Sequence, residues 1–385
     1  RQLSHFLRNG GETISPPFQM TASRGNVAMF AISQTVQRKL FFSNTIRDGA
    51  YGLSKQTVWF TVLPLIFIGT TTGCSFYFRQ ETPKDIEVLP WLIALFFVGM
   101  PHGAADLAVL RSKKKGRKVW EAFLWYVVSM IGVFTVFIFT PAISLIGFIV
   151  LSLWHFGSAE NTKPSGSGIS YEHLLLSFAK GGIVIGMPLA AWPAATSSVA
   201  TELITLVEPA RTLFGLPLLT HPIYSASHIA STGLALLAIA FFSWCFIFIS
   251  SARYSKTHGT KGLVKTSSVF FSYCLIGILE LITSPLFGIG IYFLAFHSWR
   301  QMPALAKHFT SPDAEIHPLR QVASVHKAAI PLLLPTWILL GVTWWSLSNS
   351  AHFRDLALLS LLVYLVVTPA HEVLCEWLST QPETA

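Results

Sequence analysis

The sequence is poor in charge and in cysteine. Only 12% of its 385 residues are Asp, Glu, Lys or Arg, whereas an ordinary soluble domain carries about 25% and needs those charges to cover its surface. This shortage excludes a disordered chain, a nucleic-acid-binding domain and most soluble enzymes. The four cysteines lie far apart and form no CxxC motif, so they indicate neither a zinc site nor a disulfide framework.

Apolar residues take the place of the missing charges. They make up 52% of the chain, with 30 Phe and 12 Trp, and form about ten stretches that are long enough, or nearly so, to cross a bilayer. We therefore predict an all-α, polytopic integral membrane helix bundle of about ten (eight to ten) transmembrane helices. The predicted spans are approximately residues 57–78, 89–110, 119–140, 142–158, 171–192, 222–250, 265–283, 285–299, 329–347 and 355–378.

The N-terminal segment has a different composition. Residues 1–55 contain seven basic and two acidic side chains, a net +5 of the chain's +9, and no long apolar run. Such a segment is typical of a disordered cytoplasmic tail or of an organelle transit peptide. We expect it to lie outside the fold, and we expect residues 56–380 to form a single transmembrane catalytic domain.

The remaining basic residues lie in short loops and predict an orientation. The loop at residues 111–118 has six basic residues in eight, and positively charged loops stay in the cytoplasm. A cytoplasmic location of this loop places both termini in the cytoplasm as well. The membrane would be the plasma membrane of a prokaryote or an organelle membrane. The same placement also makes the net charge an orientation signal, so no nucleic-acid partner is expected.

Four of the thirteen histidines fall inside predicted spans: His102, His155, His297 and His371. Ionisable residues in a span are costly to desolvate and usually face the bundle interior. All four lie near the cytoplasmic ends of even-numbered spans, within a layer roughly 10 Å deep at about 1.5 Å per residue. They can therefore converge on one metal, and imidazole ligands suit Fe(II), Cu or Zn.

Acidic residues stand close to these histidines in the sequence. Asp106 lies four residues after His102, and Glu160 follows His155 by about one turn. Each carboxylate could accept the second imidazole N–H and fix its tautomer. Glu372 directly follows the last histidine, and neighbours in a helix point in different directions, so we expect Glu372 at a helix interface.

Three motifs carry a resemblance to a known family. They are Pro-His-Gly-Ala-x-Asp at 101–106, Trp-His-Phe-Gly at 154–157 and Gly-x-Tyr-Phe-x-x-x-His-Ser-x-Arg at 290–300. Gly-Met-Pro-Leu at 186–189 and Pro-Ala-His at 369–371 add weaker support. In this order they resemble the Brp/Blh family of membrane β-carotene 15,15′-dioxygenases, which supply retinal to microbial rhodopsins.

The resemblance implies an integral-membrane enzyme that uses Fe(II) and O₂. It would cleave the central double bond of β-carotene, taken from the lipid bilayer, to give two all-trans-retinal, with a possible functional link to a rhodopsin. The implied catalytic and metal-binding residues are His102, His155 and His297. The groups implied to orient them are Asp106, Glu160 and Arg300.

The chain departs from the family pattern at the fourth metal position. Four residues after His297, where the pattern has a histidine, stands Gln301. Its amide oxygen could be a weak ligand, or His371 or His308 could complete the set. Two other functions stay open: a non-catalytic, rhodopsin-associated relative that has lost the metal, and a proton-coupled transporter that uses intramembrane histidines.

Overall fold

The structure is a computed structural model. It describes residues 54–77, 84–113, 117–159, 170–219, 224–310, 317–347 and 352–380. The predicted tail at residues 1–55 lies almost entirely outside the described residues, and Lys55–Ala385 forms one compact unit.

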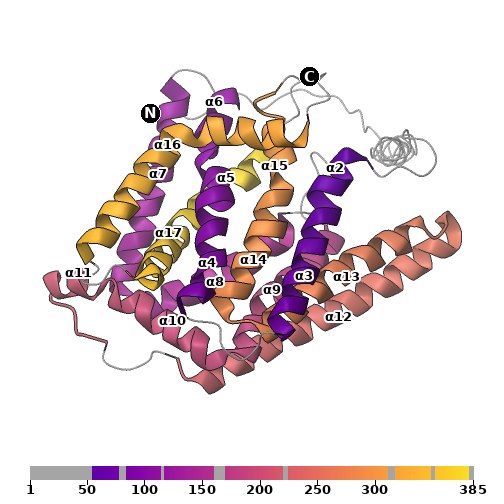
Figure 1. The fold of residues 1–385 in the computed structure, drawn as a ribbon, viewed down its shortest axis with the longest axis horizontal. Coiled ribbons are helices and arrows are strands. Elements are labelled where there is room, and N and C mark those ends of the chain that lie inside the picture. Colours follow the sequence, from indigo (N-terminus) through magenta and orange to yellow (C-terminus); the bar gives the residue numbers. More distant parts are fainter. Residues whose placement is uncertain are drawn as a thin grey trace, which may run out of the picture. The chain divides into compact units, whose positions relative to one another are not determined.

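Every regular element in the described part of the chain is a helix, which confirms the predicted fold class (Figure 1). Nine of these helices are long and apolar enough to cross a membrane. The first is α2 (Lys55–Thr57), η1 (Val58–Val62) and α3 (Leu63–Tyr77); the second is α4 (Lys84–Ala94), η2 (Leu95–Gly99), α5 (Met100–Ala104) and α6 (Asp106–Lys113). The others are α7 (Arg117–Phe139), α8 (Pro141–Ser158), α9 (Tyr171–Ala191), α12 (Ala226–His258), α13 (Lys261–Ile282), α16 (Pro318–Leu347) and α17 (Phe353–Thr380).

Local signals set where several of these helices begin. Pro141 occupies the first position of α8, where its missing N–H costs no hydrogen bond. The side chain of Ser170 accepts a hydrogen bond from the backbone N–H of His173 and caps α9, and Ser225 caps α12 through His228 in the same way.

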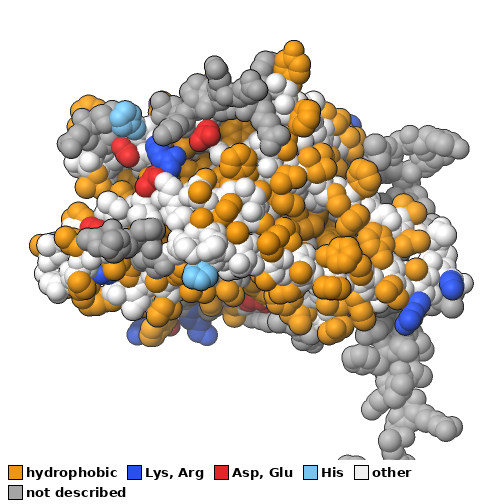
Figure 2. Space-filling view, turned by 90° about the horizontal axis from the view of Figure 1, so that it is seen from below, with side chains coloured by type: hydrophobic (Ala, Val, Ile, Leu, Met, Phe, Trp, Pro, Cys, Tyr) orange, Lys and Arg blue, Asp and Glu red, His pale blue; other side chains and the backbone are white. Residues whose placement is uncertain are grey.

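The outer surface of the bundle is apolar, as a bilayer requires. Large side chains such as Leu124, Phe271 and Trp345 are 61%, 77% and 76% exposed, and hydrophobic side chains gather over the middle and the right of the face shown in Figure 2. An exposed apolar surface of this extent is typical of contact with lipid. The chain is therefore a membrane protein.

The predicted eighth span is a helix, but it is not one of the nine. α14 (Pro285–Tyr292), η3 (Phe293–His297) and α15 (Ser298–Ala306) follow each other without interruption. Most side chains of α14 and η3 are buried, and α14 packs against α4 in the middle of Figure 1. This segment is a core helix that other helices surround.

Two π-helical turns lie directly beside predicted site residues. η2 ends three residues before His102, and η3 ends at His297. A π turn changes the direction of the side chains that follow it and is frequent at functional sites. The His326 ring on α16 lies 2.7 Å from the Phe97 carbonyl oxygen of η2 and so gives that turn a hydrogen-bond partner.

The segment at residues 193–221, which lies between two predicted spans, is partly helical. It contains α10 (Pro193–Thr205) and α11 (Glu208–Leu213), and buried Leu203 gives α10 an apolar contact with the core. Arg211 is buried as well, because its guanidinium donates hydrogen bonds to the carbonyl oxygens of Ile138 and Pro217. It thereby satisfies a carbonyl at the end of α7 that lacks a helical partner.

Glycines allow the close helix contacts that position two of the histidines. A Cβ atom on Gly157 of α8 would collide with the backbone of Ser177 on α9, and one on Gly290 of α14 would collide with the backbone of Trp91 on α4. The first contact lies two residues after His155. These helices can therefore approach only because no side chain stands between their backbones.

The contact at Gly157 gives a test of the packing. We expect Gly157→Ala to lower the free energy of unfolding by about 1–3 kcal/mol, since the added methyl group overpacks the α8–α9 interface. Gly147→Ala on the same helix is the matched control, because a Cβ there meets nothing within 4 Å. Unfolding of both variants in detergent micelles measures the difference, and equal stabilities would contradict the prediction.

Candidate metal centre

Four buried histidines from four helical segments meet in the bundle. His102 lies on α5, His155 on α8, His297 at the end of η3 and His371 on α17. Their exposed fractions are 8%, 5%, 0% and 6%. The structure thus brings together the four residues that the sequence places at a common depth.

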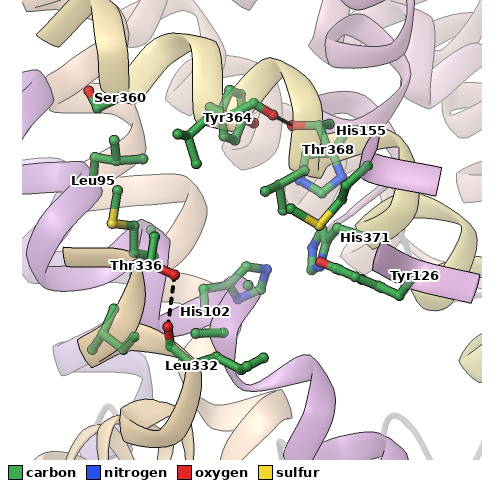
Figure 3. Close-up of a pocket in the computed structure, with 18 of the residues that line it drawn as sticks. Leu95, His102, Tyr126, His155, Leu332, Thr336, Ser360, Tyr364, Thr368 and His371 are labelled. Atoms are coloured by element: carbon green, nitrogen blue, oxygen red, sulfur yellow. Dashed lines mark hydrogen bonds between the residues drawn. The ribbon is translucent and has the colours of Figure 1, made fainter. Parts of the chain in front are cut away.

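The distances between the rings are short. The Nε2 atoms of His155 and His297 are 3.1 Å apart. The ring centroid of His102 lies 5.1 Å from that of His371 and 6.2 Å from that of His297, and the centroids of His155 and His371 are 5.5 Å apart. Three of the rings, His102, His155 and His371, are visible around the cavity in Figure 3.

Two carboxylates fix the tautomers of two of these rings. His155 Nδ1 lies 2.6 Å from Glu372 Oε2, and His371 Nδ1 lies 2.7 Å from Asp106 Oδ2. An ionised carboxylate only accepts hydrogen bonds, so each Nδ1 carries a proton, and in the neutral ring Nε2 keeps a lone pair. This arrangement is the one that metal-binding histidines commonly have.

The two other rings have buried nitrogen atoms that make no hydrogen bond. Nδ1 of His102 and Nδ1 of His297 are both buried and have no partner within the described part of the chain. A buried polar atom without a partner costs free energy, so it needs an explanation. Nε2 of His297 faces His155, so a ligand inside the cluster, such as a metal ion, would account for the His102 atom and leave Nδ1 of His297 unexplained.

The spacing of the ring pairs can be compared with that of two imidazoles on one metal ion. With metal–nitrogen bonds of about 2.1 Å, the centroids of two bound imidazoles lie roughly 4.5–6.4 Å apart, depending on the angle between the bonds. The centroid distances given above lie within this range. As the rings stand, no group of three or more His, Cys, Asp or Glu side chains among the described residues has the geometry of a metal site.

Asp106 supports a different histidine from the one that the spacing predicts. Asp106 follows the single turn residue Ala105 between α5 and α6, and Nδ1 of His102 has no hydrogen-bond partner within the described part of the chain. Its carboxylate accepts hydrogen bonds from His371 and, at 3.1 Å, from the hydroxyl group of Tyr126 on α7. A tertiary contact thus replaces the local pair expected from the sequence.

Glu372 takes the role that the sequence gave to Glu160. Glu160 lies outside the described residues, whereas Glu372 reaches from α17 to His155. The position of Glu372 at a helix interface agrees with the prediction, but its pairing with a site histidine was missed. Cys375 was missed as well: its Sγ lies 3.5 Å from His371 Nε2. In the sequence, only the positions of Glu372 and Cys375, one and four residues after His371, could have indicated that they belong to the site.

The remaining predicted site residues have other contacts. Gln301 donates a hydrogen bond of 2.8 Å from its amide nitrogen to the carbonyl oxygen of Ala159 at the end of α8. The Arg300 guanidinium lies over the Phe296 ring, 4.4 Å from its centroid. His308 follows α15 and contacts Phe309.

A cavity of about 210 Å³ opens beside the cluster. His102, His155 and His371 form part of its wall, and most of the other side chains that line it are apolar. The cluster therefore faces an apolar space, where the attraction between charges and dipoles is stronger than in water.

Membrane-spanning helices and a buried histidine cluster supported by carboxylates define this protein as an integral-membrane protein with a candidate metal centre. The chain belongs to the β-carotene 15,15′-dioxygenase family, because the sequence model of that family matches residues 93–379. The resemblance noted in the sequence is thereby confirmed.

Two relatives are similar over most of their length. The β-carotene 15,15′-dioxygenase of uncultured marine bacterium 66A03 is 24% identical over 304 residues, which cover 76% of this chain and 95% of the relative. The probable β-carotene 15,15′-dioxygenase Blh of Halobacterium salinarum (strain ATCC 700922 / JCM 11081 / NRC-1) is 22% identical over 308 residues. These residues cover 75% of this chain and 83% of the relative. No solved structure matches the chain.

The cluster predicts which residue acts as the fourth imidazole. We expect His371→Ala to weaken Fe(II) binding at least about tenfold, because the ring belongs to the cluster. Gln301→Ala should leave binding within about twofold, since its amide is engaged at the end of α8. Anaerobic Fe(II) titration of the purified variants measures both affinities. A larger loss for Gln301→Ala than for His371→Ala would assign the fourth position to Gln301.

Proposed function

We propose that the protein is an iron-dependent dioxygenase that cleaves the central 15,15′ double bond of β-carotene with O₂ to give two all-trans-retinal. The observation that carries the proposal is the buried group of four imidazoles beside an apolar cavity, in a member of this family. Neither the metal ion nor the substrate is part of the structure, so their roles are inferred from the residues that would contact them.

The residues that would hold iron are His102, His155, His297 and His371. Four imidazoles without a thiolate suit Fe(II), among other transition metals, and bound iron would supply the activation of O₂. Glu372 and Asp106 hold Nδ1 of His155 and of His371, so that a metal ion would be bound through Nε2 of each ring.

The surroundings of the cluster exclude water. The ring of Phe293 stacks on His297 with a centroid distance of 5.3 Å, and Phe156 meets the same ring edge-on at 4.9 Å. Both phenylalanines are 2–3% exposed. A site with little water limits side reactions of an activated oxygen species.

The proposed reaction balances without an external reductant. The double bond between C15 and C15′ breaks, and each of these two carbons takes one oxygen atom of O₂ to become an aldehyde. Both products are apolar and stay in the bilayer. A rhodopsin that binds retinal is the kind of protein that could receive them, and we retain the cytoplasmic location of both termini as part of the proposal.

The alternative of a non-catalytic relative rested on Gln301. The position of His371 in the cluster weakens that argument, because a fourth imidazole is present although it comes from another helix. We therefore favour an active enzyme.

Expression in bacteria that accumulate β-carotene tests the activity. The protein should produce retinal with loss of the orange colour, and His102→Ala should abolish retinal formation by removing one imidazole of the cluster. Gln301→His should preserve or raise it. His228→Ala is the matched control, because His228 is exposed and far from the cluster in sequence and fold. Persistence of β-carotene in membranes that contain the wild-type protein would contradict the proposed function.

A further inference from the structure

We infer that the cavity beside the histidines is the inner end of a lateral entrance between α7 and α16, through which a linear polyene passes from the bilayer to the cluster. This inference rests on the proposed function, since it names the route of the same substrate. It is carried by the placement of the cavity, by the chemistry of its wall and by its size.

The cavity lies between two helices on the lipid side of the bundle. Val127 and Met130 of α7 line it, together with Leu332 and Thr336 of α16, and all four side chains are half-buried. Among the nine candidate spans, α7 and α16 have the smallest buried shares, at 11% and 17%. The cavity wall therefore includes the edges of the two helices that are most exposed to lipid.

α17 closes the inner side of this space. It packs against both α7 and α16, and its residues Val363 and Val367 line the cavity between them. Further along the same helix, Thr368 and His371 continue the wall to the cluster. Figure 3 shows Thr336 on the side of the cavity opposite His155 and His371. The space thus extends from the lipid-facing edges of α7 and α16 to the histidines.

Three of the hydroxyl groups in the wall are engaged within their own helices, that of Tyr126 donates to Asp106 on α6, and that of Tyr364 makes no hydrogen bond within the described part of the chain. Thr336 donates to the carbonyl oxygen of Leu332, Thr368 to that of Tyr364 and Ser360 to that of Ala357, at 2.8, 2.6 and 2.7 Å. A polar ligand would lose its hydrogen bonds to water here and could not replace them with bonds from these three hydroxyl groups. Each polar group of the ligand left without a partner would cost about 1–3 kcal/mol. The wall therefore suits a hydrocarbon.

Gly103 keeps space open next to the cluster. It directly follows His102 and lines the cavity, and a Cβ atom at this position would meet nothing within 4 Å. Helix packing thus does not require the missing side chain here, in contrast to Gly157. The free space beside the histidine is room for a ligand.

The cavity is too small to enclose a long polyene completely. Its volume of about 210 Å³ is below the roughly 300–1,000 Å³ of pockets that bury a drug-sized ligand. A substrate whose middle lies at the histidines must therefore extend beyond the cavity. The side between α7 and α16 leads to lipid, where an apolar end group is soluble.

Blocking the entrance after folding tests the inference. In Thr336→Cys, a bulky, membrane-permeant thiol reagent applied to membranes would fill the cavity between α16 and the cluster. We expect retinal formation to fall at least about tenfold, because a small displacement of a substrate is enough to misplace its reacting atoms. Leu339→Cys is the matched control, since Leu339 lies on the same helix and is 65% exposed. Retinal formation by the treated control and by the treated wild type should change less than about twofold.

The iron content of each sample shows whether the reagent acts on the entrance or on the metal. Unchanged iron with lost retinal formation in treated Thr336→Cys supports the inference, whereas unchanged retinal formation with the cysteine fully modified overturns it. Val127→Trp, with exposed Val128→Trp as its control, tests the α7 side in the same way. If Val127→Trp keeps its iron and the wild-type rate, the entrance does not lie along α7.

A binding measurement separates this inference from the proposed function. Should the wild type form no retinal, the amount of β-carotene that copurifies with it decides the matter. Loss of that β-carotene in treated Thr336→Cys, but not in treated Leu339→Cys, supports the entrance although cleavage fails. Equal β-carotene in both variants overturns it.

Discussion

The structure of the site depends on the pairing of buried imidazoles with buried carboxylates. Glu372 and His371 are neighbours on α17, but they point to different helices, Glu372 to His155 on α8 and His371 to Asp106 on α6. A buried polar group is stable only if it has a partner. The two pairs therefore fix the rotation and the depth of α17 relative to both helices, and they place His371 within the cluster.

The backbone of the neighbouring helices is adapted to the same purpose. The π turn η3 ends at His297, and its Phe293 ring stacks on that histidine. Phe293 also occupies the space where a Cβ atom on Gly99 of η2 would stand. The two π turns therefore pack against each other through one aromatic ring, and a side chain at Gly99 would push η3 and its histidine away.

The sequence predicted the membrane bundle and the four histidines, because both follow from the scarcity of charge. A run of apolar residues identifies a span, and an imidazole within it is conspicuous. The partners of the histidines could not be predicted in this way. Spacing along one helix pairs Asp106 with His102, whereas the position of α17 pairs it with His371. Such contacts between distant segments leave no periodic signal, and Tyr126 was missed for the same reason.

Gln301 shows how a substitution at a site can be compatible with its chemistry. Its amide nitrogen binds the Ala159 carbonyl oxygen at the end of α8, and this bond joins α15 to the helix that carries His155. A glutamine at this position thus stabilises the contact between two of the helices that form the site. The cluster has its fourth imidazole from another helix: His371 of α17 contacts the rings of His102 and His155, and its Nδ1 lies 2.7 Å from Asp106 Oδ2.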